Sequence, residues 1–441
     1  MNGPVRWTQS AIIQMAAIAV IAVGLRGWIA VTTTRVPLAD ETSYDESGWS
    51  IATGGGYVVD GKVAFKAPLY SAFLAGVYRV CGHDYRAARV AQAALGASLC
   101  LLVVWLGGAL LGPTEGLLAG WICAVYPPFI WLTRLLLSEN LFIWLSVLSL
   151  VWLVRYLRSP RISNAVVLGI LGGLSALTRP TGLIATVVLA GLILALHRNA
   201  RSARQRWLGA VLVCTACAAT ILPWTVRNWT RLHAFVPITS HGGRDLYVSW
   251  TWIPDGKRLG FGSLAPEDEQ AIQTMGELET EQYLYQQTIT YLRRHPQEIS
   301  RLSALKTLYF WSPFDWEVLG GGQGVYNGAY VFLLPFMLLA LIWSAARPPP
   351  ETQWICAAFI ACHFITAVIF CGLPRYRLPI EPILILLASR GLLAFVLVGN
   401  QWSASRAGSA VALAGVHAAA AVYSSQVKIM ARVTMEWLRL W

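Results

Sequence analysis

The sequence is short of charge. Only 13% of its 441 residues are Asp, Glu, Lys or Arg, whereas a soluble domain usually has about 25%. This shortage excludes a protein whose main solvent is water. Hydrophobic residues make up 56% of the chain, and several apolar runs have the length of roughly 18 to 25 residues that a helix needs to cross about 30 Å of hydrocarbon. The composition predicts a polytopic membrane protein.

Motifs for soluble ligands are missing as well. The chain has no Gly-x-Gly-x-x-Gly or P-loop motif for a nucleotide, and its seven histidines show no His-x-x-x-His spacing. Its eight cysteines lie mostly in apolar segments, and the one Cys-x-x-Cys pair, Cys214 and Cys217, falls inside a predicted span. These patterns predict neither a disulfide framework nor a zinc site. The N-terminal apolar run is too long for a signal sequence, so we expect a retained first helix.

The basic residues are not clustered with stacking aromatic residues, as a nucleic-acid site would require, despite a net charge of +12. We therefore expect no nucleic-acid partner. Arg155, Arg158 and Arg161 lie between two apolar runs, and four more arginines lie within residues 198–206. Short loops rich in Arg are cytoplasmic in membrane proteins. This places the N-terminus inside and puts outside the segments 32–86, 178–181, 224–324 and 373–377.

The apolar runs predict ten spanning helices, near residues 10–31, 87–111, 115–132, 137–157, 163–178, 181–197, 207–224, 325–345, 353–372 and 377–398, with a weaker eleventh near 408–424. The domain organisation that follows is a first transmembrane helix (1–31), a first external loop with an acidic motif and a juxtamembrane helix (32–86), transmembrane helices 2 to 7 (87–224), an external helical region (225–324), transmembrane helices 8 to 10 (325–398) and a C-terminal segment (399–441).

Carboxylates gather directly after the first span. Asp40, Glu41 and Asp45 lie within six residues, together with Tyr44. A carboxylate near the bilayer surface can act as the general base for an incoming hydroxyl. The alternative is a solvated acidic loop.

Single charges mark the expected external ends of other spans. Lys66 stands where a polar loop becomes a membrane-lying helix, and an ammonium there can bind a phosphate or a lipid headgroup. Glu139 opens the fourth span, and a carboxylate at membrane depth is costly unless it is paired or lines a cavity; alternatively it complements the helix dipole. Arg179, in the turn between spans five and six, is a natural partner for Glu139 or for an anionic ligand.

Further arginines lie on the predicted external face of the membrane, where arginine is usually scarce. Arg227 ends the seventh span, and Arg375 and Arg377, with Tyr376 between them, lie between spans nine and ten. Arginine outside runs against the positive-inside bias, so these residues indicate an anionic partner. Guanidinium binds a lipid phosphate through two parallel donors; the alternative is headgroup contact only. Such cations could steady a departing phosphate while a carboxylate deprotonates the acceptor. This scheme requires no cofactor, and the sequence leaves a divalent metal open.

These short motifs, in their order and on one face, resemble the GT-C membrane glycosyltransferases. The resemblance covers residues 11–395 and is to the bacterial branch of glycosyltransferase family 39, near the protein O-mannosyltransferases, the lipid A aminoarabinose transferase and the rhizobial lipopolysaccharide-core transferases. The motifs that show the resemblance are Asp40-Glu41 with Tyr44, Lys66-Ala67-Pro68-Leu69, Leu137-Ser138-Glu139, Leu177-Thr178-Arg179-Pro180, Pro223-Trp224 with Arg227-Asn228, and Pro374-Arg375-Tyr376-Arg377-Leu378-Pro379.

The resemblance implies an all-α GT-C fold with about 10–11 transmembrane helices and external juxtamembrane helices. It implies Asp40 as the catalytic base, supported by Glu41, and Lys66 as a ligand of the donor phosphate, although Ala67 replaces a proline of the family motif. We therefore expect an inverting transferase in the bacterial inner membrane that moves a sugar from a polyprenyl-phosphate donor to a cell-envelope lipid, lipopolysaccharide, other glycan or protein on the periplasmic face. Membrane lipids would surround it.

Two other classes are compatible with a charged membrane face. One is a transporter or flippase of polyprenyl-linked sugars, and the other is a non-catalytic scaffold. Transporters usually show inverted repeats and broken helices near the midplane, and the sequence shows neither. A scaffold would not need acids and cations on the same face.

Overall fold

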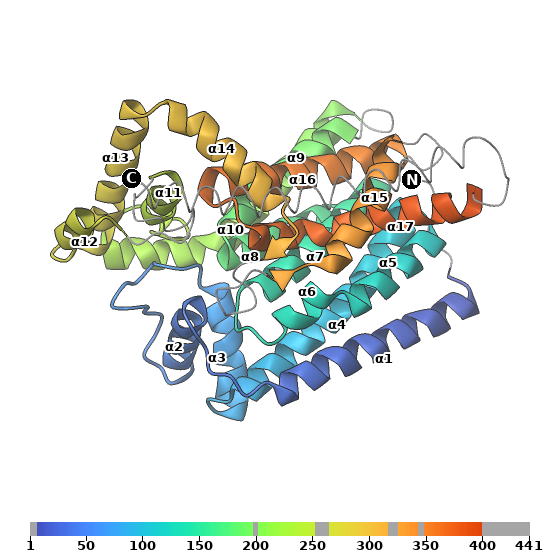
Figure 1. Ribbon diagram of the computed structural model, residues 1–441, viewed down its shortest axis with the longest axis horizontal. Coiled ribbons are helices and arrows are strands. Elements are labelled where there is room, and N and C mark those ends of the chain that lie inside the picture. Colours follow the sequence, from blue (N-terminus) through green and yellow to red (C-terminus); the bar gives the residue numbers. More distant parts are fainter. Residues whose placement is uncertain (1–6, 197–201, 252–263, 316–324, 343–347, 399–441) are drawn as a thin grey trace, which may run out of the picture.

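The structure is a computed structural model that describes residues 7–196, 202–251, 264–315, 325–342 and 348–398. Apolar helices lie side by side in a bundle (Figure 1). They are α1 (Gln9–Thr32), α4 (Tyr85–Leu110), α5 (Pro113–Val125), α7 (Glu139–Arg158), α8 (Ile162–Thr178), α9 (Thr181–Leu196), α10 (Ala203–Leu232), α15 (Gly328–Ile342), α16 (Pro350–Phe370) and α17 (Glu381–Val398).

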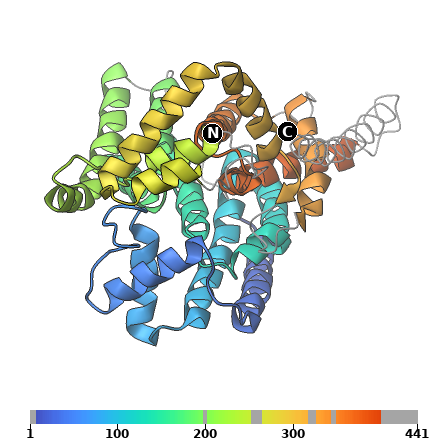
Figure 2. The ribbon, with the colours of Figure 1, turned by 60° about the vertical axis from the view of Figure 1, so that its left-hand side comes forward.

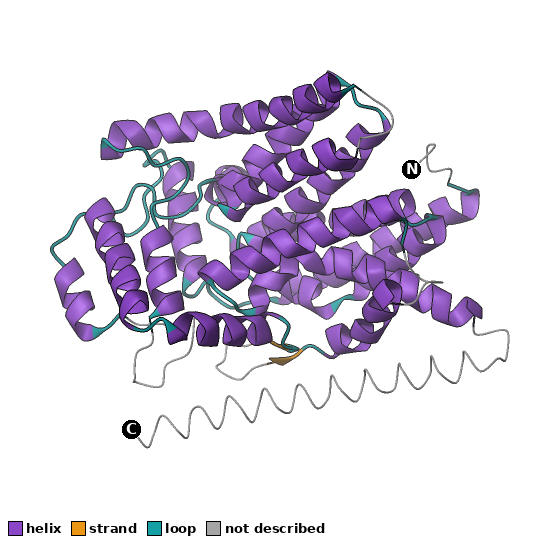
Figure 3. Ribbon diagram, turned by 90° about the horizontal axis from the view of Figure 1, so that it is seen from above, coloured by secondary structure: helices purple, strands orange, loops and turns teal. Residues whose placement is uncertain are grey.

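Shorter helices gather toward one end of the bundle, on the left of Figure 1. We call them the cap, which consists of α2 (Asp40–Ala52), α3 (Leu69–Cys81), α11 (Gly242–Trp250), α12 (Pro266–Ile272), α13 (Glu277–Arg294) and α14 (Gln297–Phe310). The remaining elements are α6 (Pro127–Leu132), the 3-10 helix η1 (Pro374–Ile380) and the antiparallel strands β1 (Phe314–Asp315) and β2 (Val325–Tyr326). Figure 3 shows helices throughout and this one short strand pair.

Each of the ten predicted spans contains a helix. In the described ranges, six helices are long and apolar enough to cross a membrane: α1, α4, α7, α10, α16 and the continuous η1–α17 segment. Predicted spans three, five, six and eight form apolar helices shorter than 18 residues. The chain is therefore a multi-pass membrane protein with an all-α architecture, as predicted. The weaker segment 408–424 lies outside the described residues.

The third predicted span is interrupted between α5 and α6, and a buried arginine binds the carbonyls that the interruption leaves without donors. Pro127 and Pro128 have no N–H, so the carbonyls of Cys123 and Ala124 lose the donors that would continue the helix. Arg26 of α1 donates to both carbonyls, at 3.0 and 2.9 Å, and is fully buried. An irregular backbone inside a membrane bundle is stable only where such partners exist.

Close helix contacts depend on small residues. A Cβ at Gly169 of α8 would lie 2.4 Å from the Val213 carbonyl of α10, and one at Gly173 would lie 2.9 Å from the Cys217 carbonyl. Glycine lets membrane helices approach at this distance. The contact fixes α10 against α8 and thereby fixes the loops at their cap ends.

The cap differs from the expectation at its start. We expected an acidic loop after the first span, but Asp40 begins helix α2, which packs on α3 (Figures 1 and 2). The segment predicted to hold a juxtamembrane helix contains α3, and the predicted external helical region 225–324 contains α11, α12, α13 and α14. The short helix α2 is what fixes the direction of its carboxylates.

Candidate active site

Asp40 is the half-exposed carboxylate of a group of charges at the boundary of the bundle and the cap. Its side chain is 50% exposed. Lys66 Nζ lies 2.8 Å from Asp40 Oδ1, and Arg375 Nη1 lies 3.3 Å from Asp40 Oδ2. Ala39, directly before it, has a φ of 52°, a conformation that costs a non-glycine residue on the order of 1–3 kcal/mol. The chain therefore turns sharply at the point where Asp40 begins α2.

The electrostatics of Asp40 are set by opposing causes. Burial raises the pKa of a carboxyl, but the positive charges of Lys66 and Arg375 outweigh burial and hold the pKa of Asp40 well below its ordinary value. Asp40 is therefore ionised at neutral pH in this arrangement.

Glu139 is the buried carboxylate of the same group. It is 1% exposed and begins α7, where the helix dipole favours an anion. Arg179 Nη1 lies 2.6 Å from Glu139 Oε1, and Arg375 Nε donates to the same oxygen. A buried carboxylate is stable only with such partners. Arg375 thus links Glu139 to Asp40, and we call Asp40, Lys66, Glu139, Arg179 and Arg375 the charge cluster.

Two tyrosines flank the charge cluster. The Lys66 ammonium lies 4.6 Å from the ring centre of Tyr44, and the Arg179 guanidinium lies 5.0 Å from that of Tyr376. Cations are attracted to the face of an aromatic ring. Tyr44 also donates to Ser138 Oγ at 3.2 Å, next to Glu139.

The five charged residues of the charge cluster come from five separate segments of the chain, and the sequence analysis had proposed all five as site residues.

Glu41 points away from the charge cluster. Adjacent residues on a helix do not share a face, and Glu41 is 3% exposed while Asp40 is open. Arg35 forms an ion pair with it at 2.6 Å, and the Leu136 N–H donates to its Oε1 at 2.7 Å. Glu41 therefore ties the start of α2 to the segment before α7.

Asp45 also serves the packing of the cap. Its carboxylate accepts hydrogen bonds from the hydroxyls of Tyr78 and Tyr85, at 2.6 and 3.1 Å, and lies 2.8 Å from His83 Nε2. The His83 ring stacks on Trp49, with 4.7 Å between the centres. These contacts join α2 to α3 and to the start of α4. They therefore fix the position of α2, the helix that begins at Asp40.

Arg377 does not join the charge cluster, although the sequence placed it with Arg375 at the phosphate. It is 2% exposed and forms an ion pair with Glu381 at 3.1 Å. It donates to the carbonyls of Phe310 and Ser312, both at 2.7 Å, and lies 3.8 Å from the Tyr330 ring centre. Its guanidinium is thus occupied in holding the end of α14.

Arg227 is occupied in a similar way. It donates to the carbonyls of Val63 and Tyr57, the latter at 2.8 Å, and lies 4.6 Å from the Trp224 ring centre. The Tyr57 hydroxyl in turn donates to the Lys66 carbonyl at 2.7 Å. Arg227 therefore supports the loop that carries Lys66, and contacts the charge cluster only through it.

Asp245 was not identified from the sequence. It lies on α11, with Oδ1 3.6 Å from His241 Nε2. Desolvation and the nearby carboxylates of Glu281 and Asp40 raise its pKa, which the His241 charge partly offsets. In the sequence, only the i,i+4 spacing of His241 and Asp245 could have indicated that the two side chains are paired.

Among the residues that the structure describes, no group of three His, Cys, Asp or Glu side chains could hold a metal ion.

Comparisons with known proteins bear on the family and the fold. Residues 65–224 match the model of the dolichyl-phosphate-mannose-protein mannosyltransferase family. This range runs from the loop carrying Lys66 to the Trp224 turn of α10, and it includes Glu139 and Arg179. No curated protein sequence is a significant match to the chain.

Solved structures share the architecture over nearly the whole chain. The archaeal oligosaccharyltransferase AglB of Archaeoglobus fulgidus, solved with an inhibitory peptide and a dolichol-phosphate, has a TM-score of 0.55 and 14% identity over 96% of this chain and 56% of its own. An Archaeoglobus fulgidus oligosaccharyltransferase tethered to an acceptor peptide by a disulfide bond has a TM-score of 0.55 and 15% identity, over 96% of this chain and 55% of its own. The chain thus spans about half the length of these proteins.

A weaker similarity is to ArnT of Cupriavidus metallidurans bound to undecaprenyl phosphate, with a TM-score of 0.45 and 13% identity over 89% of this chain and 78% of that one. The similarity to the oligosaccharyltransferase, together with the apolar helices, confirms the fold that the motifs predicted. The chain is a multi-pass membrane protein with the GT-C glycosyltransferase fold.

Proposed function

We propose that the protein is an inverting glycosyltransferase that moves a sugar from a polyprenyl-phosphate carrier to a hydroxyl of a cell-envelope lipid, glycan or protein. The observation that carries the proposal is the half-exposed Asp40 carboxylate held between Lys66 and Arg375. The match to a mannosyltransferase family and the dolichol-phosphate bound by the similar oligosaccharyltransferase support it.

The reaction takes place at the cap, which we assign to the periplasmic face of a bacterial inner membrane. The cap consists of segments that the positive-inside rule predicts to be external. Arg158, at the end of α7, and Arg204, at the start of α10, belong instead to the Arg-rich loops predicted to be cytoplasmic.

Lys66 and Arg375 bind the phosphate of the donor. The Lys66 side chain is 11% exposed and the Arg375 side chain 13%. A phosphate that enters beside Asp40 competes with the Asp40 carboxylate for these two cations. Arg offers parallel donors and Lys a point charge, a combination that suits a phosphate. Glu139 and Arg179 keep the Arg375 guanidinium in place, because Glu139 holds both arginines.

Donor binding also makes Asp40 a better base. In the free protein the two cations lower its pKa, and a carboxylate of low pKa accepts protons poorly. When the donor phosphate takes over part of the cationic charge, the pKa of Asp40 rises. The base thus becomes effective only when the donor is present.

The chemical step then follows from these positions. Asp40 accepts the proton of the acceptor hydroxyl while the oxygen attacks the anomeric carbon opposite the phosphate. The carbon–oxygen bond to the phosphate breaks, and the carrier phosphate leaves with the electron pair, stabilised by Lys66 and Arg375. One displacement inverts the anomeric configuration.

The proposal is tested with the purified protein in nanodiscs, a panel of polyprenyl-phosphate sugars and a cell-envelope extract. New glycan masses, lost in Asp40→Asn, are the expected result. Consumption of no carrier by the wild-type protein would overturn the proposal. Movement of the carrier between leaflets without a glycosidic product would identify a flippase instead.

A further inference from the structure

Three arginines gather around one carboxylate behind the start of α2. Arg89 of α4 is 1% exposed and donates to the carbonyls of Arg35 and Arg134, at 2.6 and 3.0 Å. One guanidinium thus holds the loop after α1 against the segment between α6 and α7. Glu41 pairs with Arg35 at 2.6 Å, and its charge also acts on Arg89 and Arg134. The group therefore has three positive charges against one negative charge.

Arg134 is the arginine of this group that has no anionic partner in the described part of the chain. Its guanidinium lies 4.5 Å from the Trp131 ring centre, and its Nε is buried without a hydrogen-bond partner among the described residues. Arg89 instead donates to three carbonyls, and Arg35 binds both oxygens of Glu41. Burial and the charge of Arg35 lower the pKa of Arg134, and Glu41 offsets this only in part. An anion beside Arg134 would remove this penalty on the charged form.

The surroundings of Arg134 indicate that such an anion is part of a lipid. By the alternation that puts the first external loop outside, the connection between α6 and α7 also lies at the external face. Trp28 near the end of α1 and Trp131 of α6 are exposed, and so are Val36 and Leu38 in the loop after α1. Tryptophan is enriched at the membrane–water interface, and α6 packs against α1. These residues place Arg134 at the level of the lipid head groups.

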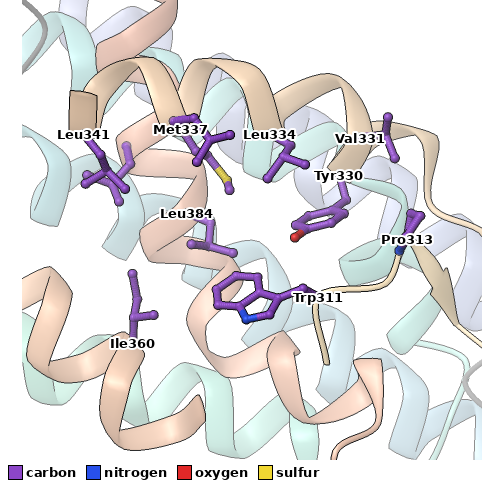
Figure 4. A pocket seen from close by; sticks show the side chains of 11 residues that line it. Trp311, Pro313, Tyr330, Val331, Leu334, Met337, Leu341, Ile360 and Leu384 are labelled. Atoms are coloured by element: carbon purple, nitrogen blue, oxygen red, sulfur yellow. The ribbon is translucent and has the colours of Figure 1, made fainter. Parts of the chain in front are cut away.

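The apolar pocket between α15, α16 and α17 provides no such partner for an anion. Its volume is about 420 Å³, and Trp311, Tyr330, Leu334 and Leu384 surround it in Figure 4. None of the side chains in its lining carries a charge. A lipid phosphate therefore has a partner beside Arg134 that this pocket lacks.

We propose that Arg134 and Arg35 bind the phosphate of an anionic phospholipid in the outer leaflet. The Arg35 side chain is 21% exposed, so its guanidinium can face a phosphate on one side and keep Glu41 on the other. Guanidinium groups offer parallel donors that fit phosphate oxygens, and basic pockets beside membrane helices bind lipid head groups in this way. The exposed apolar residues around the two arginines contact the acyl chains.

This lipid site is separate from the charge cluster, and it does not rest on sugar transfer. Glu41 points away from the charge cluster and accepts a hydrogen bond from the Leu136 N–H at 2.7 Å. A lipid held by Arg134 and Arg35 joins the two segments that bind Glu41. It therefore stabilises the start of α2 without contacting Asp40.

Lipid binding by the full chain in detergent tests the proposal. Native mass spectrometry counts the phosphatidylglycerol or phosphatidylcholine bound at rising lipid concentration. One phosphatidylglycerol should bind more tightly than phosphatidylcholine, and Arg134→Gln should weaken it about tenfold, as expected for one lost hydrogen bond to a charged group. Arg79→Gln is the matched control, because Arg79 is an exposed arginine of α3 in the same external segment as Arg35.

Three results of this titration would overturn the inference. The first is an equal loss of phosphatidylglycerol affinity in the two variants, and the second is an equal affinity of the wild-type protein for the two lipids. The third is displacement of the lipid by inorganic phosphate at equal concentration, because the bound group would then be a free anion.

A measurement on the wild-type protein does not depend on the folding of a variant. The protein is placed in nanodiscs of phosphatidylglycerol or of phosphatidylcholine and treated with phenylglyoxal, which modifies guanidinium groups, and the modified residues are located by mass spectrometry. Arg134 should be modified less in phosphatidylglycerol, while modification of Arg79 stays the same. Equal modification of Arg134 in the two membranes, or an equal decrease at both arginines, contradicts the inference.

Discussion

Arg375 and Arg377 lie two residues apart in η1, yet their guanidinium groups serve different parts of the molecule. Arg375 contacts Asp40 and Glu139 in the charge cluster. Arg377 is buried beside Glu381 and holds the end of α14. One short helix thus contacts both the charge cluster and the cap. We therefore expect substitutions of the two arginines to differ in their effects on stability and on carrier binding.

Asp40→Asn should abolish transfer and retain carrier binding. Loss of a general base lowers the rate typically by about 10²- to 10⁴-fold, whereas Lys66 and Arg375 lose only a competitor for the phosphate. The turnover rate and the Kd for a polyprenyl phosphate, measured in the same nanodiscs, check this. Glu46→Gln is the matched control, because Glu46 is an exposed acid on the same helix. Full activity in Asp40→Asn would remove Asp40 from the mechanism.

Glu139→Gln should destabilise the protein by about 3 kcal/mol, because it leaves Arg179 and Arg375 with a buried charge and a lost partner. The measurement is the free energy of unfolding in detergent, or the shift in unfolding midpoint where unfolding is irreversible. Glu298→Gln removes an ion pair to Arg301, which is 45% exposed, and should cost less than about 1 kcal/mol. Equal effects of the two changes would show that the buried pair is not a structural requirement.

Arg377→Lys should lower stability but leave the Kd for the carrier phosphate nearly unchanged. A lysine cannot donate to the carbonyls of Phe310 and Ser312 and to Glu381 at once. The end of α14 would loosen, while Arg375 would keep its contacts with Asp40 and Glu139. Thermal unfolding, kcat and carrier binding are measured together. A stable variant with weakened carrier binding would favour the phosphate contact expected from the sequence.

Lys306→Met should stabilise the protein at neutral pH. Lys306 is 2% exposed, its Nζ has no hydrogen-bond partner in the described part of the chain, and it lies 3.4 Å from the Trp250 ring centre. Burial lowers the pKa of Lys306 from 10.5 to about 7. Between these values the unfolded chain binds the extra proton, so the stability of the wild-type protein rises with pH.

The advantage of Lys306→Met should therefore be greatest near pH 7 and shrink toward pH 10. Unfolding midpoints of both proteins across this range check the sign. An advantage independent of pH would mean that the ammonium is solvated in the folded state.

Most of the helical layout could be predicted from the sequence, because a run of apolar residues long enough for the bilayer has few other stable conformations. Each of the ten ranges predicted in this way contains a helix, six of them long and apolar enough to cross a membrane, although Pro127 and Pro128 divide one range. Helix α2 was missed, because its polar sequence carries no apolar periodicity and its start depends on contacts of Glu41 and Asp45 with distant segments.

The charged residues show the same division. Sequence alone determined that Glu139, Arg375 and Arg377 needed partners, since a carboxylate at membrane depth is costly without one and arginine on the external face runs against the positive-inside bias. Neighbours such as Asp40 and Glu41, or Arg375 and Arg377, have the same chemistry in a sequence. Only the tertiary structure decided which of each pair faces the charge cluster and which fixes the packing, because direction along a helix and the arrival of remote segments determine the partner.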